Sequence, residues 1–235
     1  MKIDRKSFPN RDKQKKDIHD SFGTRLFVDK KIPITGRSAK NYSIQLFPDI
    51  SSVKLIEYLK DKDYLDLACG INHLYPQSLL SKLSNHKKRH GLDIHNMNDK
   101  KESQIEYFKG SAFKTQFPNQ SYDCITINNY LYFWETNADN VLKIFKELNR
   151  ICKEGGEIRV FPVFFGNYYY DNIELFDYLN QHFSIRLLRP KKDYSDESPI
   201  FLEDNEIKKL EKNSGLVEYK TNHELMANCL ILKKL

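Results

Sequence analysis

Residues 64–76 read YLDLACGINHLYP, a hydrophobic strand that contains an acid and runs into a turn with a lone glycine. In a doubly wound α/β sheet the loop after the first strand lets the backbone approach a ligand closely. Ala68 and Gly70 are small enough for such a loop. The turn lacks both the dinucleotide pattern G-x-G-x-x-G and the phosphate-binding pattern G-K-[ST]. The stretch therefore predicts a nucleoside ligand without a pyrophosphate.

A second acid supports this interpretation. Asp93 ends the expected strand RHGLDI and follows Asp66 by 27 residues. This is near the spacing at which an acid from the second strand reaches a ribose diol. The alternative is that Asp66 and Asp93 only cap helices or turns.

The composition indicates a globular protein. The chain has 235 residues, of which 40% are hydrophobic and 30% charged, and no run of eighteen apolar residues could span a bilayer. No apolar segment of the secretory type follows the first residues. The four cysteines form no C-x-x-C pair. We therefore expect a soluble, cytoplasmic protein with no disulfide framework, no metal site and no membrane contact.

The positive charge is concentrated at the start of the chain. Residues 1–17 contain seven Lys or Arg and three Asp, a net charge of +4 out of a formal +6. Such an arm can contact phosphate backbones or acidic partners. The simpler interpretation is a solvated tail that keeps the protein in solution.

Strand and helix signals alternate along the middle of the chain. The expected helices are 51–61, 75–83, 137–153 (closed by Gly155-Gly156) and 171–183, and the expected strands are 64–68, 89–94, 105–110, 122–128 and 157–164. Nearly all-apolar strands such as YDCITIN are typical of a buried parallel sheet. The alternation predicts an α/β fold with helices on both faces of a doubly wound sheet.

The two ends of the chain depart from this alternation. Residues 21–49 contain Pro33, Gly36 and Pro48 and are expected to be extended and irregular. Towards the carboxyl end we expect a strand at SIRLL, a helix over 204–213, and an antiparallel pair formed by GLVEYK and NCLILKK. We divide the chain into a basic arm or lid over 1–50 and one domain over 51–235, with a substrate-side insertion at about 164–202.

Four stretches in this order resemble the class I S-adenosylmethionine-dependent methyltransferases. DLACGIN looks like the first motif, GLDI like the end of the second strand, and KGSAF with FPNQSYDCITINN like the adenine-side loop and fourth strand. KELNRICKEGGEIRVFP is similar to the following helix, turn and fifth strand, and resembles a bacterial branch with G-G-E-x-R-x-[FY]-P at this strand. The resemblance implies a Rossmann-like, seven-stranded, mostly parallel sheet with an antiparallel last strand.

The resemblance also implies a role for individual residues toward S-adenosylmethionine. Asp93 would take the ribose hydroxyls, and Asp66 would orient the loop or the methionine ammonium. The other expected contacts are Ala68, Gly70 and Asn72 in the first loop, Ser111 and Ala112 beside adenine, and Asn128 beside the methyl group. Ala68 and Asn72 stand where the family has glycines, and Ser111 where it often has Asp. Alanine costs little at a negative φ, and asparagine tolerates the left-handed region.

The catalytic residues are less defined, because an in-line displacement at a sulfonium carbon mainly requires alignment. Asn129, Tyr130 and His95 are the candidates. An aromatic wall of Tyr130, Tyr132 and Trp134 could face a cationic transition state, although such clusters are more often ordinary packing. Tyr168, Tyr169 and Tyr170 are expected near the acceptor.

Three functional classes remain open. The first is methyl transfer to a small-molecule acceptor by a monomer or homodimer. The second is an RNA methyltransferase that uses the arm of residues 1–17, since ACGIN-x-L also looks like the first motif of the ribosomal RNA methyltransferases of aminoglycoside resistance. The third is a cofactor-binding or degenerate protein that does not catalyse.

Overall fold

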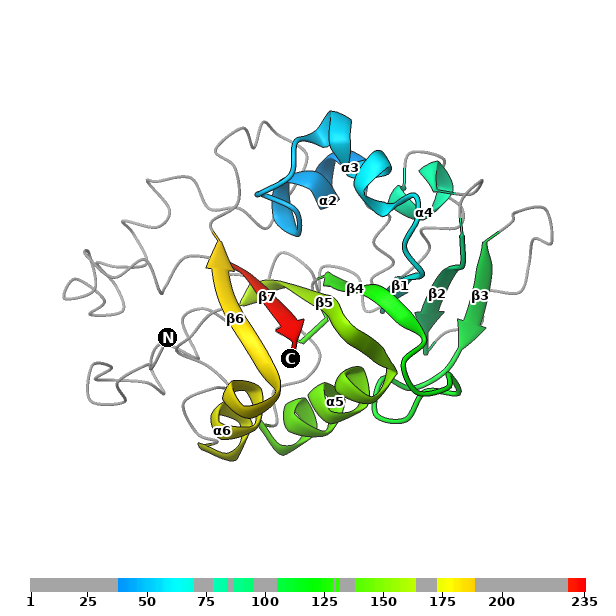
Figure 1. Cartoon of the computed structure of the whole chain (residues 1–235). Coiled ribbons are helices and arrows are strands. Elements are labelled where there is room, and N and C mark those ends of the chain that lie inside the picture. The colour runs from blue at the N-terminus through cyan, green and yellow to red at the C-terminus, as the bar shows by residue number, and fades with distance from the viewer. Residues whose placement is uncertain are drawn as a thin grey trace, which may run out of the picture.

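The computed structural model describes residues 38–69, 78–83, 87–94, 105–128, 130–131, 138–163, 173–188 and 228–235. Within them, seven strands form one sheet in the order β3-β2-β1-β4-β5-β7-β6 (Figure 1). The strands are β1 (Tyr64–Leu67), β2 (Arg89–Asp93), β3 (Glu106–Lys109), β4 (Tyr122–Asn128), β5 (Cys152–Val163), β6 (Phe183–Leu188) and β7 (Asn228–Lys234). Strands β1 to β5 pair in parallel, and β7 is antiparallel to both β5 and β6. This confirms the predicted Rossmann-like methyltransferase fold.

Helices cover both faces of the sheet (Figure 1). Helices α2 (Ala39–Gln45), α3 (Ser52–Leu59) and α4 (Leu79–Lys82) lie on one side, and α5 (Ala138–Ile151) and α6 (Ile173–His182) lie on the other. Successive residues of β1 face opposite sides of the sheet. Leu65 and Leu67 belong to the core under α5, whereas Tyr64 belongs to the core under α2 and α3. Each face of the sheet is therefore covered by a separate apolar core.

Helix α5 carries the predicted apolar stripe. Val141, Ile144, Leu148 and Ile151 are all completely buried. The prediction that Gly155-Gly156 closes this helix is wrong, since β5 begins at Cys152 and contains both glycines. The physical reason is an irregular register: Tyr122 pairs with Cys152 and Cys124 pairs with Glu157, so β5 accommodates extra residues there. Gly155 takes a φ of 69° in this bulge.

The expectation of irregular structure over residues 21–49 is wrong for residues 39–45, which form α2. Ser38 caps this helix by accepting a hydrogen bond from the Asn41 backbone N–H at 3.1 Å. Leu46 and Phe47 follow and are completely buried in the core under α3. The helix is only seven residues long and mostly polar, so its periodicity was too weak to reveal it.

The carboxyl-terminal pairing also differs from the prediction. Strand β7 is flanked on one edge by β5 and on the other by β6, which contains the predicted SIRLL strand. Strand β6 therefore forms the antiparallel pair with β7 that we expected GLVEYK to form. GLVEYK, the expected helix over 204–213 and the basic arm of residues 1–17 lie outside the described residues. Among the described residues, none of the helices is both long enough and apolar enough to cross a bilayer.

Candidate functional site

The strand order reverses between β1 and β4, and this reversal marks the edge where a ligand would bind. Leu67 pairs with Leu92 on one side and with Ile127 on the other. The next positions along the chain, Ala68, Asp93 and Asn128, therefore lie along the same carboxyl edge. Asp93 in turn pairs with Lys109, which brings the turn at Ser111 and Ala112 to this edge as well.

The structure thus brings together six of the predicted site residues, namely Asp66, Ala68, Asp93, Ser111, Ala112 and Asn128. Gly70, Asn72, His95 and Asn129 lie outside the described residues, as do Tyr132, Trp134 and the three tyrosines at 168–170. Tyr130 is half-buried and packs against the core on the α5 side of the sheet.

Ala68 occupies the position of the first glycine in the motif, and its backbone is left-handed with a φ of 57°. Its N–H donates to the Leu92 carbonyl oxygen at 2.7 Å, which fixes the start of the turn against β2. A left-handed conformation costs a non-glycine residue about 1–2 kcal/mol. The turn therefore keeps the conformation that glycine favours, and the alanine makes it more costly.

Asp66 lies on the α2 side of β1, where it is only 1% exposed. Its Oδ2 accepts a hydrogen bond from the Tyr42 hydroxyl at 2.7 Å, and its Oδ1 accepts one from the Thr126 hydroxyl at 3.0 Å. Thr126 also shares a hydrogen bond with the Tyr64 hydroxyl at 2.6 Å. The carboxylate is thus held by groups of α2 and β4, one residue before the left-handed turn.

Cys69 follows Ala68 and lies close to both site acids. Burial, reinforced by the negative charges of Asp66 and Asp93, raises the pKa of the Cys69 thiol well above its usual value. The thiol stays protonated at neutral pH, so Cys69 is not an activated nucleophile. All four cysteines of the chain are buried free thiols.

The edge near β2 and β3 combines polar and apolar groups. Asp93 is partly exposed, and its backbone carbonyl accepts from the Gly110 N–H at 2.9 Å. The Ser111 hydroxyl accepts from the Phe113 N–H at 3.2 Å, which shapes the turn after β3. Ile94, directly after Asp93, is an apolar side chain that is 68% exposed. Sequence reasoning missed Ile94, because only the tertiary structure shows that it is left uncovered at this edge.

At the end of β4, Asn128 is buried and 6% exposed. Its Nδ2 donates to the Oε1 of Gln45 at 2.8 Å, and Gln45 is itself buried in α2. Sequence reasoning missed both Tyr42 and Gln45. Nothing in the local pattern could have indicated them, because their partners are 24 and 83 residues away in the chain.

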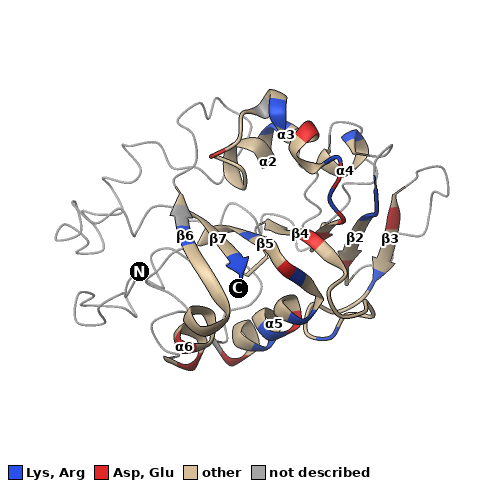
Figure 2. Ribbon diagram, viewed as in Figure 1, with Lys and Arg blue, Asp and Glu red and all other residues tan. Residues whose placement is uncertain are grey.

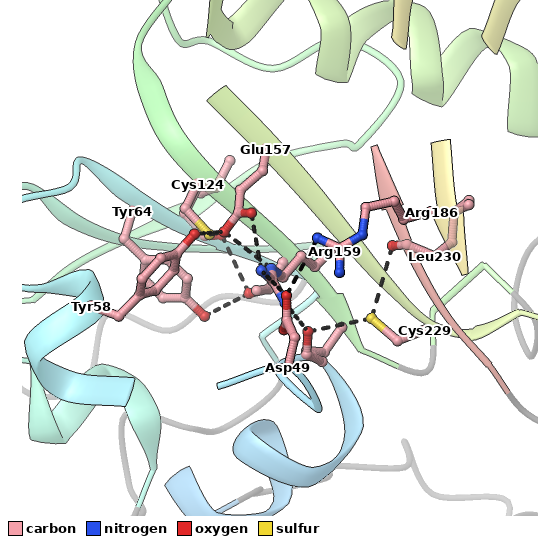
Figure 3. Close-up of polar contacts among 12 residues, drawn as sticks. Asp49, Tyr58, Tyr64, Cys124, Glu157, Arg159, Arg186, Cys229 and Leu230 are labelled. Carbon is pink, nitrogen blue, oxygen red and sulfur yellow. Dashed lines mark hydrogen bonds and ion pairs between the residues drawn. The ribbon is translucent and has the colours of Figure 1, made fainter. Parts of the chain in front are cut away.

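The E-x-R pair of the fifth strand forms a separate network behind the site (Figure 3). The Arg159 guanidinium donates to Asp49 at 2.6 and 3.3 Å and to Glu157 at 3.0 Å through two nitrogens. The Tyr58 hydroxyl donates to Glu157 at 2.6 Å. Burial opposes the positive charge, but the hydrogen bond to Asp49 and the charge of Glu157 outweigh it and raise the pKa of Arg159. The network binds α3 and the segment before it to β5.

The part of the chain that carries the site also matches a known protein family. A family model described as a methyltransferase domain matches residues 65–160. Residues 65–160 belong to the class I S-adenosylmethionine-dependent methyltransferases. The match runs from β1 into β5 and includes all six of the site residues that the structure brings together. The methyltransferase takes S-adenosylmethionine as its cofactor, as the four sequence stretches predicted. No curated protein sequence matches the chain.

Several solved methyltransferases have similar structures at low identity. The N-methyltransferase NodS from Bradyrhizobium japonicum WM9, in complex with S-adenosyl-L-homocysteine, is 11% identical, with 93% of this chain and 97% of that chain covered and a TM-score of 0.49. A SAM-dependent methyltransferase from Methanosarcina mazei is 18% identical, with 75% and 93% covered and a TM-score of 0.40. At such low identities and TM-scores, these structures do not indicate which acceptor the chain uses.

Proposed function

We propose that the methyltransferase transfers the methyl group of S-adenosylmethionine to a small-molecule acceptor. The observation that carries the proposal is the convergence of Ala68, Asp93, Ser111 and Asn128 on one carboxyl edge, at the reversal of strand order. Each offers a group that fits one part of this cofactor. The partly exposed Asp93 carboxylate can accept hydrogen bonds from the two ribose hydroxyls.

The adenine end of the cofactor fits the edge formed by β2 and β3. The exposed Ile94 side chain offers an apolar surface for the face of the base. Ser111 can hydrogen-bond the base edge, and the small Ala112 leaves room beside it. Gly70 and Asn72, in the turn after β1, stay predicted contacts to the methionine and ribose moieties.

The bound cofactor supplies an electrophilic methyl carbon on a sulfonium sulfur. When bound, it would donate this methyl group to a nucleophilic atom of the acceptor, with the electron pair of the broken carbon–sulfur bond kept by sulfur. The chain contributes alignment, since the reacting atoms must lie in line. Asn128 is the described residue that we place beside the methyl group, with Tyr130 nearby. Asn129 and His95 stay predicted catalytic candidates.

Enclosure of the methyl-transfer position favours a small acceptor over RNA. Asn128 and Gln45 are both buried where α2 covers the ends of β1 and β4. A buried position is reached more easily by a small molecule than by a folded polymer. In the described elements, Lys and Arg are interspersed with Asp and Glu (Figure 2), which does not favour a phosphate backbone.

The first test is binding of S-adenosylmethionine and S-adenosylhomocysteine by calorimetry and thermal shift. The wild type should bind both saturably, and ligand at a hundred times its Kd should add about 2.7 kcal/mol to the free energy of unfolding. Asp93→Ala should lose most of this affinity. Asp61→Ala is the matched control, because this exposed acid precedes β1 at the opposite edge of the sheet. Equal binding by wild type and Asp93→Ala would contradict the assigned role of Asp93.

The second test separates the acceptor classes with methyl-labelled cofactor. Label should pass to molecules of a small-metabolite extract and not to purified ribosomal RNA. Labelling of RNA that disappears on deletion of residues 1–17 would instead support the RNA methyltransferase. Absence of cofactor binding would support a non-catalytic protein.

A further inference from the structure

Side chains of helix α2 contact two of the strands that end at the cofactor edge. Tyr42 and Gln45 lie three residues apart, so they share one face of the helix. Both are buried, and each hydrogen-bonds a residue at a strand end: Tyr42 bonds Asp66 of β1 at 2.7 Å, and Gln45 bonds Asn128 of β4 at 2.8 Å. One helix face therefore spans the point where the strand order reverses.

The carboxyl end of α2 is itself fixed to the other half of the sheet. The Leu46 carbonyl oxygen accepts from the Arg159 Nη1 at 2.9 Å and from the Cys229 thiol at 3.3 Å. The Arg159 guanidinium lies over the Phe47 ring, 4.4 Å from its centre. These contacts to β5 and β7 make α2 a rigid support for the side chains it presents to β1 and β4.

Docking of α2 does not require the two polar contacts. Leu46 and Phe47 are completely buried, and apolar burial already supplies the attachment. A buried hydrogen bond adds little net stability but strongly restricts the orientation of both partners. Apolar residues at positions 42 and 45 would therefore suffice for packing, whereas Tyr42 and Gln45 hold particular rotamers of Asp66 and Asn128.

We infer that Tyr42 and Gln45 are positioning residues for methyl transfer. Tyr42 orients the Asp66 carboxylate and with it the left-handed turn at Ala68, so it acts on the whole cofactor. Gln45 orients the Asn128 amide, so it acts on the methyl group. The inference rests on the proposed function, because it assumes that S-adenosylmethionine binds at this edge.

The test measures the Kd of full-length variants for S-adenosylmethionine and S-adenosylhomocysteine by calorimetry. Tyr42→Phe, which removes only the hydroxyl, should weaken both ligands about tenfold, since a hydrogen bond to a buried charged group is lost. Gln45→Met should change the ratio of the two Kd values by about threefold or more, because it acts where the two ligands differ. Ser43→Ala is the matched control, since within the described part of the chain this buried hydroxyl donates to the Lys40 carbonyl oxygen of its own helix and to neither strand end. Its affinities should stay within about twofold of wild type.

A double-mutant cycle separates positioning from general destabilisation. If Gln45 acts through Asn128, adding Gln45→Met to an Asn128→Ala variant should change neither Kd further. Thermal unfolding without ligand identifies variants that fail to fold, and Gln45→Ala replaces Gln45→Met should that variant not fold. A merely structural role of Gln45 would lower the melting temperature and leave the Kd ratio unchanged. A merely structural role of Tyr42 would lower the melting temperature and leave both Kd values unchanged.

Two results would overturn the inference, and they are distinguishable. If wild type binds both ligands while Tyr42→Phe and the Gln45 variant match the Ser43→Ala control, the inference fails and the proposed function stands. If wild type binds neither ligand, both fail together.

Discussion

Replacing the buried Arg159 with Met should destabilise the fold more than the same replacement of the exposed Arg186. Arg159 is 2% exposed, and its guanidinium bonds Asp49 and Glu157 at 2.6 to 3.3 Å. Met keeps much of the apolar stem but removes the guanidinium that lies between two poorly solvated carboxylates, leaving Asp49, among the described residues, with only the exposed, more distant Arg186 at 3.8 Å. Breaking a buried ion pair costs about 3–5 kcal/mol. For a domain of this size, that lowers the melting temperature by roughly 6–20 °C.

The loss in free energy of unfolding caused by Arg159→Met should become smaller as the pH falls. Burial by itself would raise the pKa of Asp49, but the hydrogen bond and charge of Arg159 hold it below its usual value of 3.8. In wild type the contribution of Asp49 is therefore present above this pH and is lost as pH falls below it. In Arg159→Met burial is opposed by a backbone hydrogen bond and by the more distant Arg186. The pKa of Asp49 therefore rises relative to wild type, and protonation relieves the buried charge. The difference between the two proteins should shrink as pH falls from neutral toward about 4.5.

Urea unfolding followed by circular dichroism at both pH values measures this difference. Arg186→Met is the matched control, because Arg186 also approaches Asp49, at 3.8 Å, but its side chain is 58% exposed. Such an exposed pair contributes about 1 kcal/mol or less. The reasoning is refuted if Arg159→Met unfolds within about 1 kcal/mol of wild type at neutral pH, or if its deficit grows on acidification.

Two further substitutions examine the cofactor turn. Ala68→Gly should raise the free energy of unfolding by about 0.5 kcal/mol, since relief of the left-handed strain exceeds the entropy cost of glycine. The same change at Ala39, the first residue of α2, should lower the free energy of unfolding by about 0.5 kcal/mol or less. Similar losses at both positions would contradict the strain at Ala68. Gly91→Ala places a methyl group 2.6 Å from ring carbons of Tyr107 and 2.9 Å from the Cys69 sulfur, so it should cost about 1–3 kcal/mol and weaken cofactor binding through Cys69. Tyr107→Leu in the same chain should restore part of both losses, and an unchanged melting temperature for Gly91→Ala would show that this contact is looser than the structure indicates.

Local patterns accounted for most of the sheet. Nearly all-apolar runs such as YDCITIN and the stripe from Val141 to Ile151 recur with the periods of strands and helices, and these elements are present within a few residues of their predicted bounds. The bounds failed where a neighbouring strand sets the register. At Gly155-Gly156 a turn was expected from composition, whereas the pairing of Tyr122 with Cys152 makes the glycines part of a bulged strand.

The amino-acid pattern alone predicted the α/β alternation, the class of cofactor, and the strand-end positions of Asp93, Ser111 and Asn128. The alternation and the strand ends follow from periodicity, which is a property of neighbouring residues, and the class of cofactor follows from the resemblance of four stretches to a known family. The contacts of Tyr42 with Asp66 and of Gln45 with Asn128 became visible only in the folded chain. The same holds for the hydrogen bonds of the E-x-R pair with Asp49 and Tyr58. The physical reason is that a hydrogen bond between residues far apart in the chain depends on how helices and strands pack, and local propensity does not specify that packing.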